Sequence, residues 1–166
     1  MWDPAPARAN HRFALGRPAN AGQSPGTLFV VGMNPSHANE VTSDTTVNLA
    51  IEASVELKCS GWVMLNLYPE RASSPSNIGA FDQTLSDQNC AVIERVLRQH
   101  GATEVFAAWG DLKSAAVRKA KPHVLGVFAK LGVRPFYFDR LTVARQPRHL
   151  HSRGPKLDLQ APRHYL

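Results

Sequence analysis

Four short apolar runs, separated by segments with helical spacing, constrain the fold of this chain more than any other feature. Continuous runs of this kind, rich in Val and Phe, are typical of strands buried on both faces. Strands that alternate with helices predict a parallel sheet with helices on both faces. We therefore predict an α/β fold, a three-layer α/β/α sandwich around a central four-stranded parallel sheet. The runs are TLFVVGMNP, WVMLNLYP, TEVFAAWG and RPFYFDRLT, at residues 27–35, 62–69, 103–110 and 134–142.

The segments between these runs carry helix signals. The first has a candidate N-cap at Ser43 or Asp44, followed by apolar residues near helical spacing. Asp87 is the candidate cap of the second helix, and Pro122 predicts that the third is broken into two pieces. The three helical segments lie within residues 43–61, 83–101 and 111–132.

The length of 166 residues favours one domain. We predict an N-terminal arm at 1–26 with a short strand near residues 11–15, an α/β domain at 27–150 and a basic, mostly irregular tail at 151–166. Cys59 and Cys90 have no metal-ligand spacing, so we expect no metal, no cofactor and a reducing compartment. The sequence shows no apolar signal segment and no membrane-length apolar run. These features predict a cytoplasmic protein with no membrane partner.

The charge is basic, with 19 Lys and Arg against 13 Asp and Glu and a formal net charge of +6. Such a balance favours a polyanionic partner such as nucleic acid or a nucleotide. A solvated basic surface would give the same numbers, so charge alone leaves both interpretations open.

Polar side chains at the strand ends indicate where a ligand would bind, because open α/β sheets bind ligands beyond the carboxyl ends of their strands. Asn34 ends the first run, within Met-Asn-Pro-Ser. It either closes an Asx turn or presents an amide that holds a water or hydrogen-bonds a base. Asn66 interrupts the second run, where a buried amide needs hydrogen-bond partners. We expect Asn66 to face the same cleft as Asn34.

Aromatic and basic residues near these ends are further candidates. Tyr68 and Trp109 either stack on a base or belong to the core. His149 and His151 follow the fourth run, and a second Pro-Arg-His triplet at 162–164 leaves open which copy enters the site. The arginines suited to nucleic-acid backbone contact are Arg145, Arg148 and Arg153. Neither a nucleophile elbow around Ser36 nor a dinucleotide or P-loop motif is present.

Taken together, these strand ends resemble the uracil-DNA glycosylase superfamily. VVGMNPS is similar to the first motif of its single-strand-selective and mismatch-specific branches. The resemblance implies that Asn34 positions the attacking water, that Asn66 hydrogen-bonds the flipped base, and that His149, with His151 second, steadies the departing base. It implies a uracil-glycosylase-like sheet and no cofactor. The residues expected to bind the substrate are Pro35, Ser36, Asn66, Tyr68, Trp109 and His151.

Over residues 11–150 the chain resembles more closely the bacterial family called domain of unknown function 1643. The shared motifs are NPSHA (34–38), DTT (44–46), NL (66–67), RASSP (71–75), WG (109–110) and PRH (147–149). Two departures are chemical: Ser36 replaces the glycine of the glycosylase motif, and His149 is followed by Leu150-His151 rather than Pro-Leu-Tyr. The resemblances imply a hydrolase of the N-glycosidic bond of a modified or damaged base. The alternatives are a non-catalytic module that binds a nucleobase, nucleotide or nucleic acid, and a small-molecule enzyme with a nucleoside-like substrate.

Overall fold

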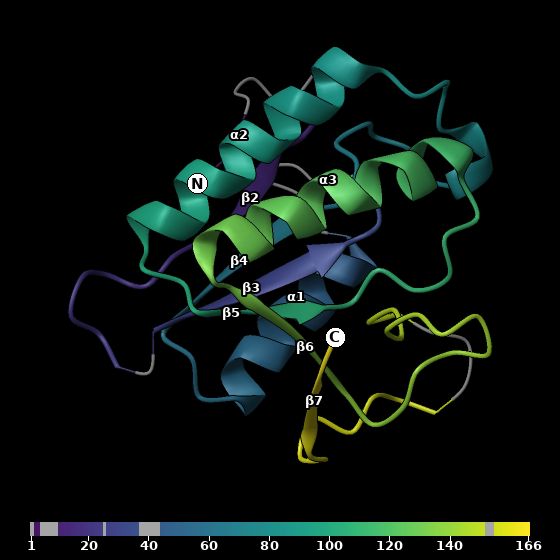
Figure 1. Cartoon of the computed structure of the whole chain (residues 1–166). Coiled ribbons are helices and arrows are strands. Elements are labelled where there is room, and N and C mark those ends of the chain that lie inside the picture. Colours follow the sequence, from purple (N-terminus) through teal and green to yellow (C-terminus); the bar gives the residue numbers. More distant parts are fainter. Residues whose placement is uncertain (1, 4–9, 25, 37–43, 152–154) are drawn as a thin grey trace.

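The computed structural model describes residues 2–3, 10–24, 26–36, 44–151 and 155–166 (Figure 1). Its strands are β1 (Trp2–Asp3), β2 (Ala14–Arg17), β3 (Thr27–Gly32), β4 (Gly61–Asn66), β5 (Glu104–Ala107), β6 (Arg134–Phe138) and β7 (Arg163–Tyr165). Its α-helices are α1 (Thr45–Glu56), α2 (Gln83–Gln99) and α3 (Ala115–Leu131), and Pro75–Asn77 form a short 3-10 helix, η1. None of the described helices is long and apolar enough to cross a membrane.

The sheet is mixed and has seven strands in the order β1-β2-β4-β3-β5-β6-β7. The four predicted strands are its parallel centre, paired as β4-β3-β5-β6. The prediction of a wholly parallel, four-stranded sheet is wrong, because β2 pairs antiparallel with β4, β1 with β2, and β7 with β6. These three strands are two to four residues long, and β7, at one edge of the sheet, is exposed along its length, so none of them carries a long apolar run. Their conformation depends on the neighbour to which they bond. The short strand expected near residues 11–15 is β2, at Ala14–Arg17.

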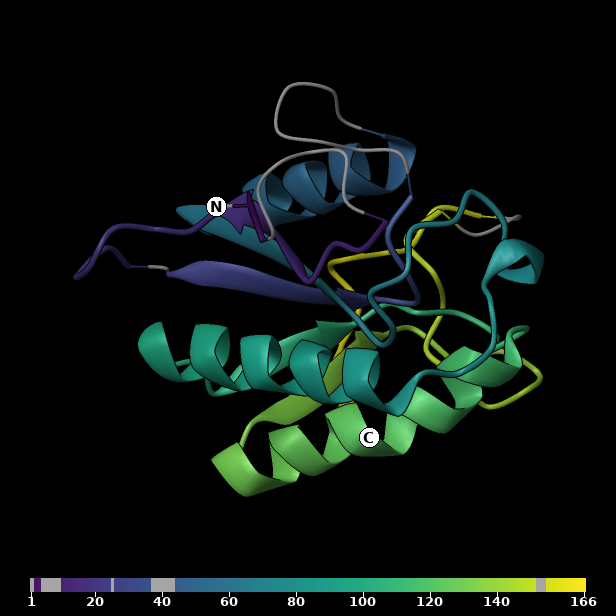
Figure 2. The ribbon, with the colours of Figure 1, turned by 90° about the horizontal axis from the view of Figure 1, so that it is seen from above.

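Alternation along the central strands decides which helices cover each face. In β3, Phe29 and Val31 pack with α2 and α3, whereas Leu28 and Val30 pack with α1 on the opposite face. Figure 2 shows the sheet between these two helical layers, with α1 on one side and α2 and α3 on the other. The three-layer arrangement therefore follows from strands that are apolar on both faces.

The helix boundaries correct two details of the sequence prediction. Asp44, one of the two predicted candidates, caps α1, and its Oδ1 accepts a hydrogen bond from the Val47 N–H at 2.9 Å. Ser43, the other candidate, lies outside the described residues. The cap of α2 is Asp82 rather than Asp87, which lies one turn inside the helix. The predicted break at Pro122 is also wrong, since α3 continues through it. Proline removes one backbone hydrogen bond, but the buried face of α3, packed against α2 and the sheet, holds the helix together.

Candidate functional site

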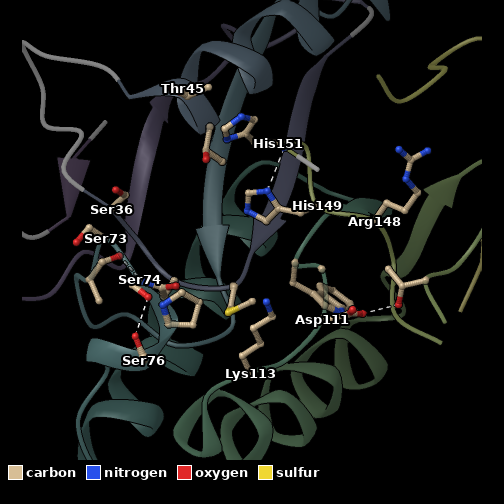
Figure 3. A pocket seen from close by; sticks show the side chains of 18 of the residues that line it. Ser36, Thr45, Ser73, Ser74, Ser76, Asp111, Lys113, Arg148, His149 and His151 are labelled. Atoms are coloured by element: carbon tan, nitrogen blue, oxygen red, sulfur yellow. Dashed lines mark hydrogen bonds between the residues drawn. The ribbon is translucent and has the colours of Figure 1, made fainter. Parts of the chain in front are cut away.

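A cavity of about 1230 Å³ lies at the carboxyl ends of β3 and β5, beside the N-terminus of α1. The loops that follow β4 and β6 complete its walls. Figure 3 shows Ser36, Ser73, Ser74 and Ser76 gathered on one side, His149 and His151 on another, and Lys113 at the lower edge. The lining includes hydroxyls from Ser36, Thr45, Thr46, Ser73, Ser74, Ser76 and Thr142, and charged groups from Asp44, Asp111, Lys113, Arg140 and Arg148.

Asn34 lines this cavity and joins two of its walls. Its Nδ2 donates to the carbonyl oxygens of Pro35 at 3.0 Å and Ala72 at 2.9 Å. The backbone N–H of Ala72 in turn donates to the Pro35 oxygen at 2.9 Å. Two carbonyl acceptors fix which end of the amide is nitrogen, because only the NH2 group can donate to them. Oδ1 is therefore the end that remains available to a ligand or a water.

His149 presents a defined tautomer to the cavity. Its Nδ1 accepts a hydrogen bond from the backbone N–H of His151 at 3.0 Å, so the neutral ring carries its proton on Nε2. Burial lowers the pKa of His149 below the usual histidine value, and the negative charge of Asp44 opposes that shift. The ring is thus held neutral near pH 7, with an N–H donor that remains for a ligand.

Gly110 makes the position of His149 possible. It adopts the left-handed conformation, with φ of +67°, and its N–H donates to the Pro147 carbonyl at 3.0 Å. A Cβ at this position would lie 3.0 Å from the Cβ of His149, closer than ordinary carbon contacts. Gly110, the glycine of the Trp-Gly motif, thus permits the left-handed turn and also leaves room for His149 to pack against it.

Asn66 is buried beside Gly32, with which it is in register across β3 and β4. Its side chain is on the α1 face, the face shared with Met64, and only 1% of the residue is exposed. Its Oδ1 is 3.1 Å from the position a Gly32 Cβ would take. Among the residues that the structure describes, neither Nδ2 nor Oδ1 of Asn66 has a hydrogen-bond partner. Asn66 is not one of the residues found to line the cavity, so the structure does not bring it to the cavity wall together with Asn34, as the sequence led us to expect. A buried amide without partners is costly, by about 1–3 kcal/mol per unpaired group.

Tyr68 and Trp109 both lie in the core. The Tyr68 hydroxyl accepts from the Asp82 N–H at 3.0 Å, which ties the start of α2 to the end of β4. Trp109 lines the cavity but is fully buried, and its Nε1–H donates to Gln146 Oε1 at 3.1 Å. In this structure neither ring offers a face on which a base could stack.

The remaining predicted binding residues divide into two groups. Ser36 and His151 line the cavity, whereas Pro35 contributes only its carbonyl to the hydrogen bond from Asn34. Arg145 is exposed near the cavity but does not line it. Arg153 lies outside the described residues.

The two Pro-Arg-His triplets have different places. The first supplies Arg148 and His149 to the cavity. The Arg148 guanidinium donates to Asp139 Oδ2 at 3.0 Å and to a backbone carbonyl, so it orders the loop after β6. In the second triplet, His164 is on edge strand β7 and stacks on Tyr137. The first copy is therefore the one at the site.

Apart from Ser36, the sequence prediction missed the hydroxyl groups of the cavity wall, and it also missed Lys113 and Asp111. Lys113 and Asp111 follow β5, so the rule that ligands bind at strand ends could have found them. Ser73 and Ser74 belong to the RASSP segment, which Asn34 holds at the cavity through its hydrogen bond to Ala72. Among the described residues no group of three or more His, Cys, Asp or Glu could hold a metal ion.

Comparison with known proteins identifies a family for the chain but no curated protein or solved structure with which its site could be compared. A family model described as "Protein of unknown function (DUF1643)" matches residues 12–149. No curated protein and no solved structure matches the chain.

Proposed function

The chain belongs to the DUF1643 family, and from the geometry of its cleft we propose that it binds a nucleobase and hydrolyses the N-glycosidic bond of a modified or damaged nucleotide. The observation that carries the proposal is the buried, unpartnered amide of Asn66. Asn66 does not itself line the cavity, so a base that reaches it must displace part of the lining. An amide offers one donor and one acceptor side by side, which matches the donor and acceptor pair on a nucleobase edge. A base bound there would supply the hydrogen bonds that the protein leaves unmade.

Two groups supply the chemistry. The Oδ1 of Asn34 accepts a hydrogen bond from a water and directs it at the anomeric carbon of the sugar. As the water oxygen bonds to that carbon, the carbon–nitrogen bond breaks and its electron pair stays with the base. The Nε2–H of His149 hydrogen-bonds the resulting anion. Since an amide is no base, the proton of the water passes to solvent.

The resemblance to the uracil-DNA glycosylase superfamily supports these assignments. Asn34, Asn66 and His149 stand at the positions of the superfamily's motifs, so the roles that the superfamily gives those positions are assigned to them. The parallel strands β4-β3-β5-β6 support such a fold through their common direction, although the sheet as a whole is mixed.

A second candidate, binding without cleavage, is favoured by the way Asn34 is used. Its NH2 group is fully engaged in holding the loop at Ala72, which is a structural task. A site whose water is held by an amide alone would cleave only bonds to labile leaving groups. The same cleft would then recognise a base and leave it attached.

A base-release assay separates the two candidates. Oligonucleotides and nucleosides carrying uracil, hypoxanthine, xanthine or an alkylated pyrimidine are incubated with the protein, and free base is measured by mass spectrometry. We expect release by the wild type, and at least a hundredfold less by His149→Ala, which keeps the Cβ that packs on Gly110. His164→Ala, in the second Pro-Arg-His triplet, is the matched control and retains activity. Release that His149→Ala leaves unchanged would refute the catalytic assignment, and binding without any release would establish the second candidate.

A further inference from the structure

Gln146 joins three elements of the fold at one side-chain oxygen. Its Oε1 accepts a hydrogen bond from the Trp109 Nε1–H at 3.1 Å and another from the Lys121 ammonium at 2.8 Å. Trp109 follows β5, Lys121 is in α3, and Gln146 lies in the loop after β6. Two donors at one oxygen fix which end of the amide is oxygen, because the NH2 end cannot accept them.

The surroundings of this oxygen make its two hydrogen bonds difficult to replace. Trp109 is fully buried, so its N–H has no water as an alternative partner. Lys121 is half-buried, and its ammonium lies 5.3 Å from the centre of the Trp109 ring. Burial lowers the pKa of Lys121, which shows that the ammonium has lost part of its hydration. A cationic donor in such a place forms a stronger hydrogen bond than it would in water.

The backbone around Gln146 extends this attachment toward His149. The Gln146 N–H donates to the Thr142 hydroxyl at 3.1 Å, and the Gln146 carbonyl accepts from the Thr142 N–H at 2.8 Å. The carbonyl of the next residue, Pro147, accepts from the Gly110 N–H at 3.0 Å. His149 follows two residues later and packs on the same glycine. The loop is therefore attached to the end of β5 at three successive points.

Gln146 and Lys121 differ from His149 in their relation to the cavity. His149 lines it, whereas neither Gln146 nor Lys121 is among the described residues that do. A group that acts on a ligand works well only when it is held within about 0.5 Å of its productive position. The path of the backbone from residue 146 to 149 sets where the His149 ring lies against Gly110, and hence where its Nε2–H points.

We propose that Gln146 is a positioning residue for His149, and that Lys121 holds Gln146 in place from α3. A lysine outside the cavity thereby helps to set the direction of a ring N–H inside it. This inference rests on the proposed function in one respect, namely that the His149 ring acts on a ligand.

The test compares Gln146→Leu with Gln146→Glu. Leucine has about the size of glutamine and no acceptor, whereas a carboxylate accepts both hydrogen bonds. The first readout is nitrogen NMR of the histidine rings, in which the His149 signals are identified by their loss in His149→Ala. We expect Gln146→Leu to shift these signals and to lose the single Nε2–H tautomer. Gln146→Glu should keep the wild-type signals.

The second readout is base release, measured at a temperature at which every variant is folded. We expect Gln146→Leu and Lys121→Met to lower kcat about tenfold with little change in KM, because the ring N–H acts on charge that develops in the transition state. Gln146→Glu should keep the wild-type kcat. A role in stability alone would lower the melting temperature and leave the kcat of the folded protein unchanged.

Matched controls remove similar side chains elsewhere. Lys130→Met removes a lysine of the same helix, whose ammonium bonds Glu94 at 2.9 Å on the surface. Gln160→Leu removes an exposed glutamine whose Nε2 donates to Glu56 at 3.4 Å. Both variants should keep the His149 signals and the base release of the wild type.

The outcomes distinguish this inference from the proposed function. If Gln146→Leu leaves the His149 signals as Gln160→Leu does, or if Gln146→Glu shifts them as far as Gln146→Leu, the inference is overturned, whatever the base-release assay gives. If the signals move but kcat does not, hydrolysis stands and the positioning role is overturned. If no protein releases base, but the signals move in Gln146→Leu and not in Gln146→Glu, the positioning of the ring is established and the hydrolytic function fails.

Discussion

The substitution Gly110→Ala tests how closely the cleft depends on one glycine. It has two effects, since it places a side chain on a left-handed residue and brings a Cβ to 3.0 Å from the Cβ of His149. Left-handed backbone costs a non-glycine residue about 1–2 kcal/mol. Carbon atoms in ordinary contact are about 3.5–4.0 Å apart, so the histidine must move by about 0.5 Å.

Gly132→Ala is the matched control. Gly132 ends α3 with the same φ of +67°, but a Cβ there would meet no atom within 4 Å. Both variants should therefore lose about 1–2 kcal/mol of unfolding free energy in urea, and melt several degrees lower than the wild type. Only Gly110→Ala should also displace His149.

The displacement is measured through His149 itself. NMR of the imidazole should show a changed chemical shift and pKa in Gly110→Ala, and wild-type values in Gly132→Ala. A shift of about 0.5 Å at a group that orients a ligand should lower base release or base binding about tenfold. If the two variants leave the His149 resonances equally unchanged, the contact between Gly110 and His149 does not position the ring, and the reasoning is refuted.

Three further predictions address stability. Asn66→Ala removes an unpartnered amide, so it should abolish ligand binding but leave the unfolding free energy within about 1 kcal/mol of the wild type. In Asn89→Ala, which loses an Nδ2 that donates to two backbone carbonyls, the unfolding free energy measured in urea should fall by about 1–3 kcal/mol. A loss of stability in Asn66→Ala larger than about 1 kcal/mol would count against a ligand role for Asn66. Burial lowers the pKa of His149, so this histidine is protonated more readily in the unfolded chain than in the folded one as pH falls below about 6.5. The unfolding free energy should therefore decline with acidification less steeply in His149→Ala than in the wild type. The same dependence of unfolding free energy on pH in both proteins would contradict the lowered pKa. Pro122→Ala restores a backbone N–H that can donate to the Arg118 carbonyl, so thermal unfolding should show that the variant is more stable by about 1 kcal/mol or more. A loss of stability would mean that the proline ring packs in the protein better than we infer.

The sequence by itself determined the parallel centre of the sheet. Runs such as 27–35 and 62–69 are apolar on both faces, and that property is local, because each residue's side of the strand follows from its place in the alternation. The cap of α1 at Asp44 was equally local, since a side-chain oxygen bonds a backbone N–H three residues on. The strand end that carries Asn34 and the loop after β6 that carries His149 could also be located, because parallel strands place their carboxyl ends along one edge.

Only the tertiary structure decided the rest. The strand β7 forms because a partner lies beside it, and its own residues carry no pattern that would predict it, whereas β2 was expected only as a short strand near residues 11–15 and its pairing with β4 was not predicted. The Tyr68 and Trp109 rings are buried in the core and do not form the surface of the cleft. The hydrogen bond between Asn34 and Ala72 could not be predicted, because the two residues are far apart in the sequence. The tautomer of His149 and the unpartnered amide of Asn66 depend on neighbours that the fold brings together, so they are properties of packing and hydrogen bonding rather than of any single segment.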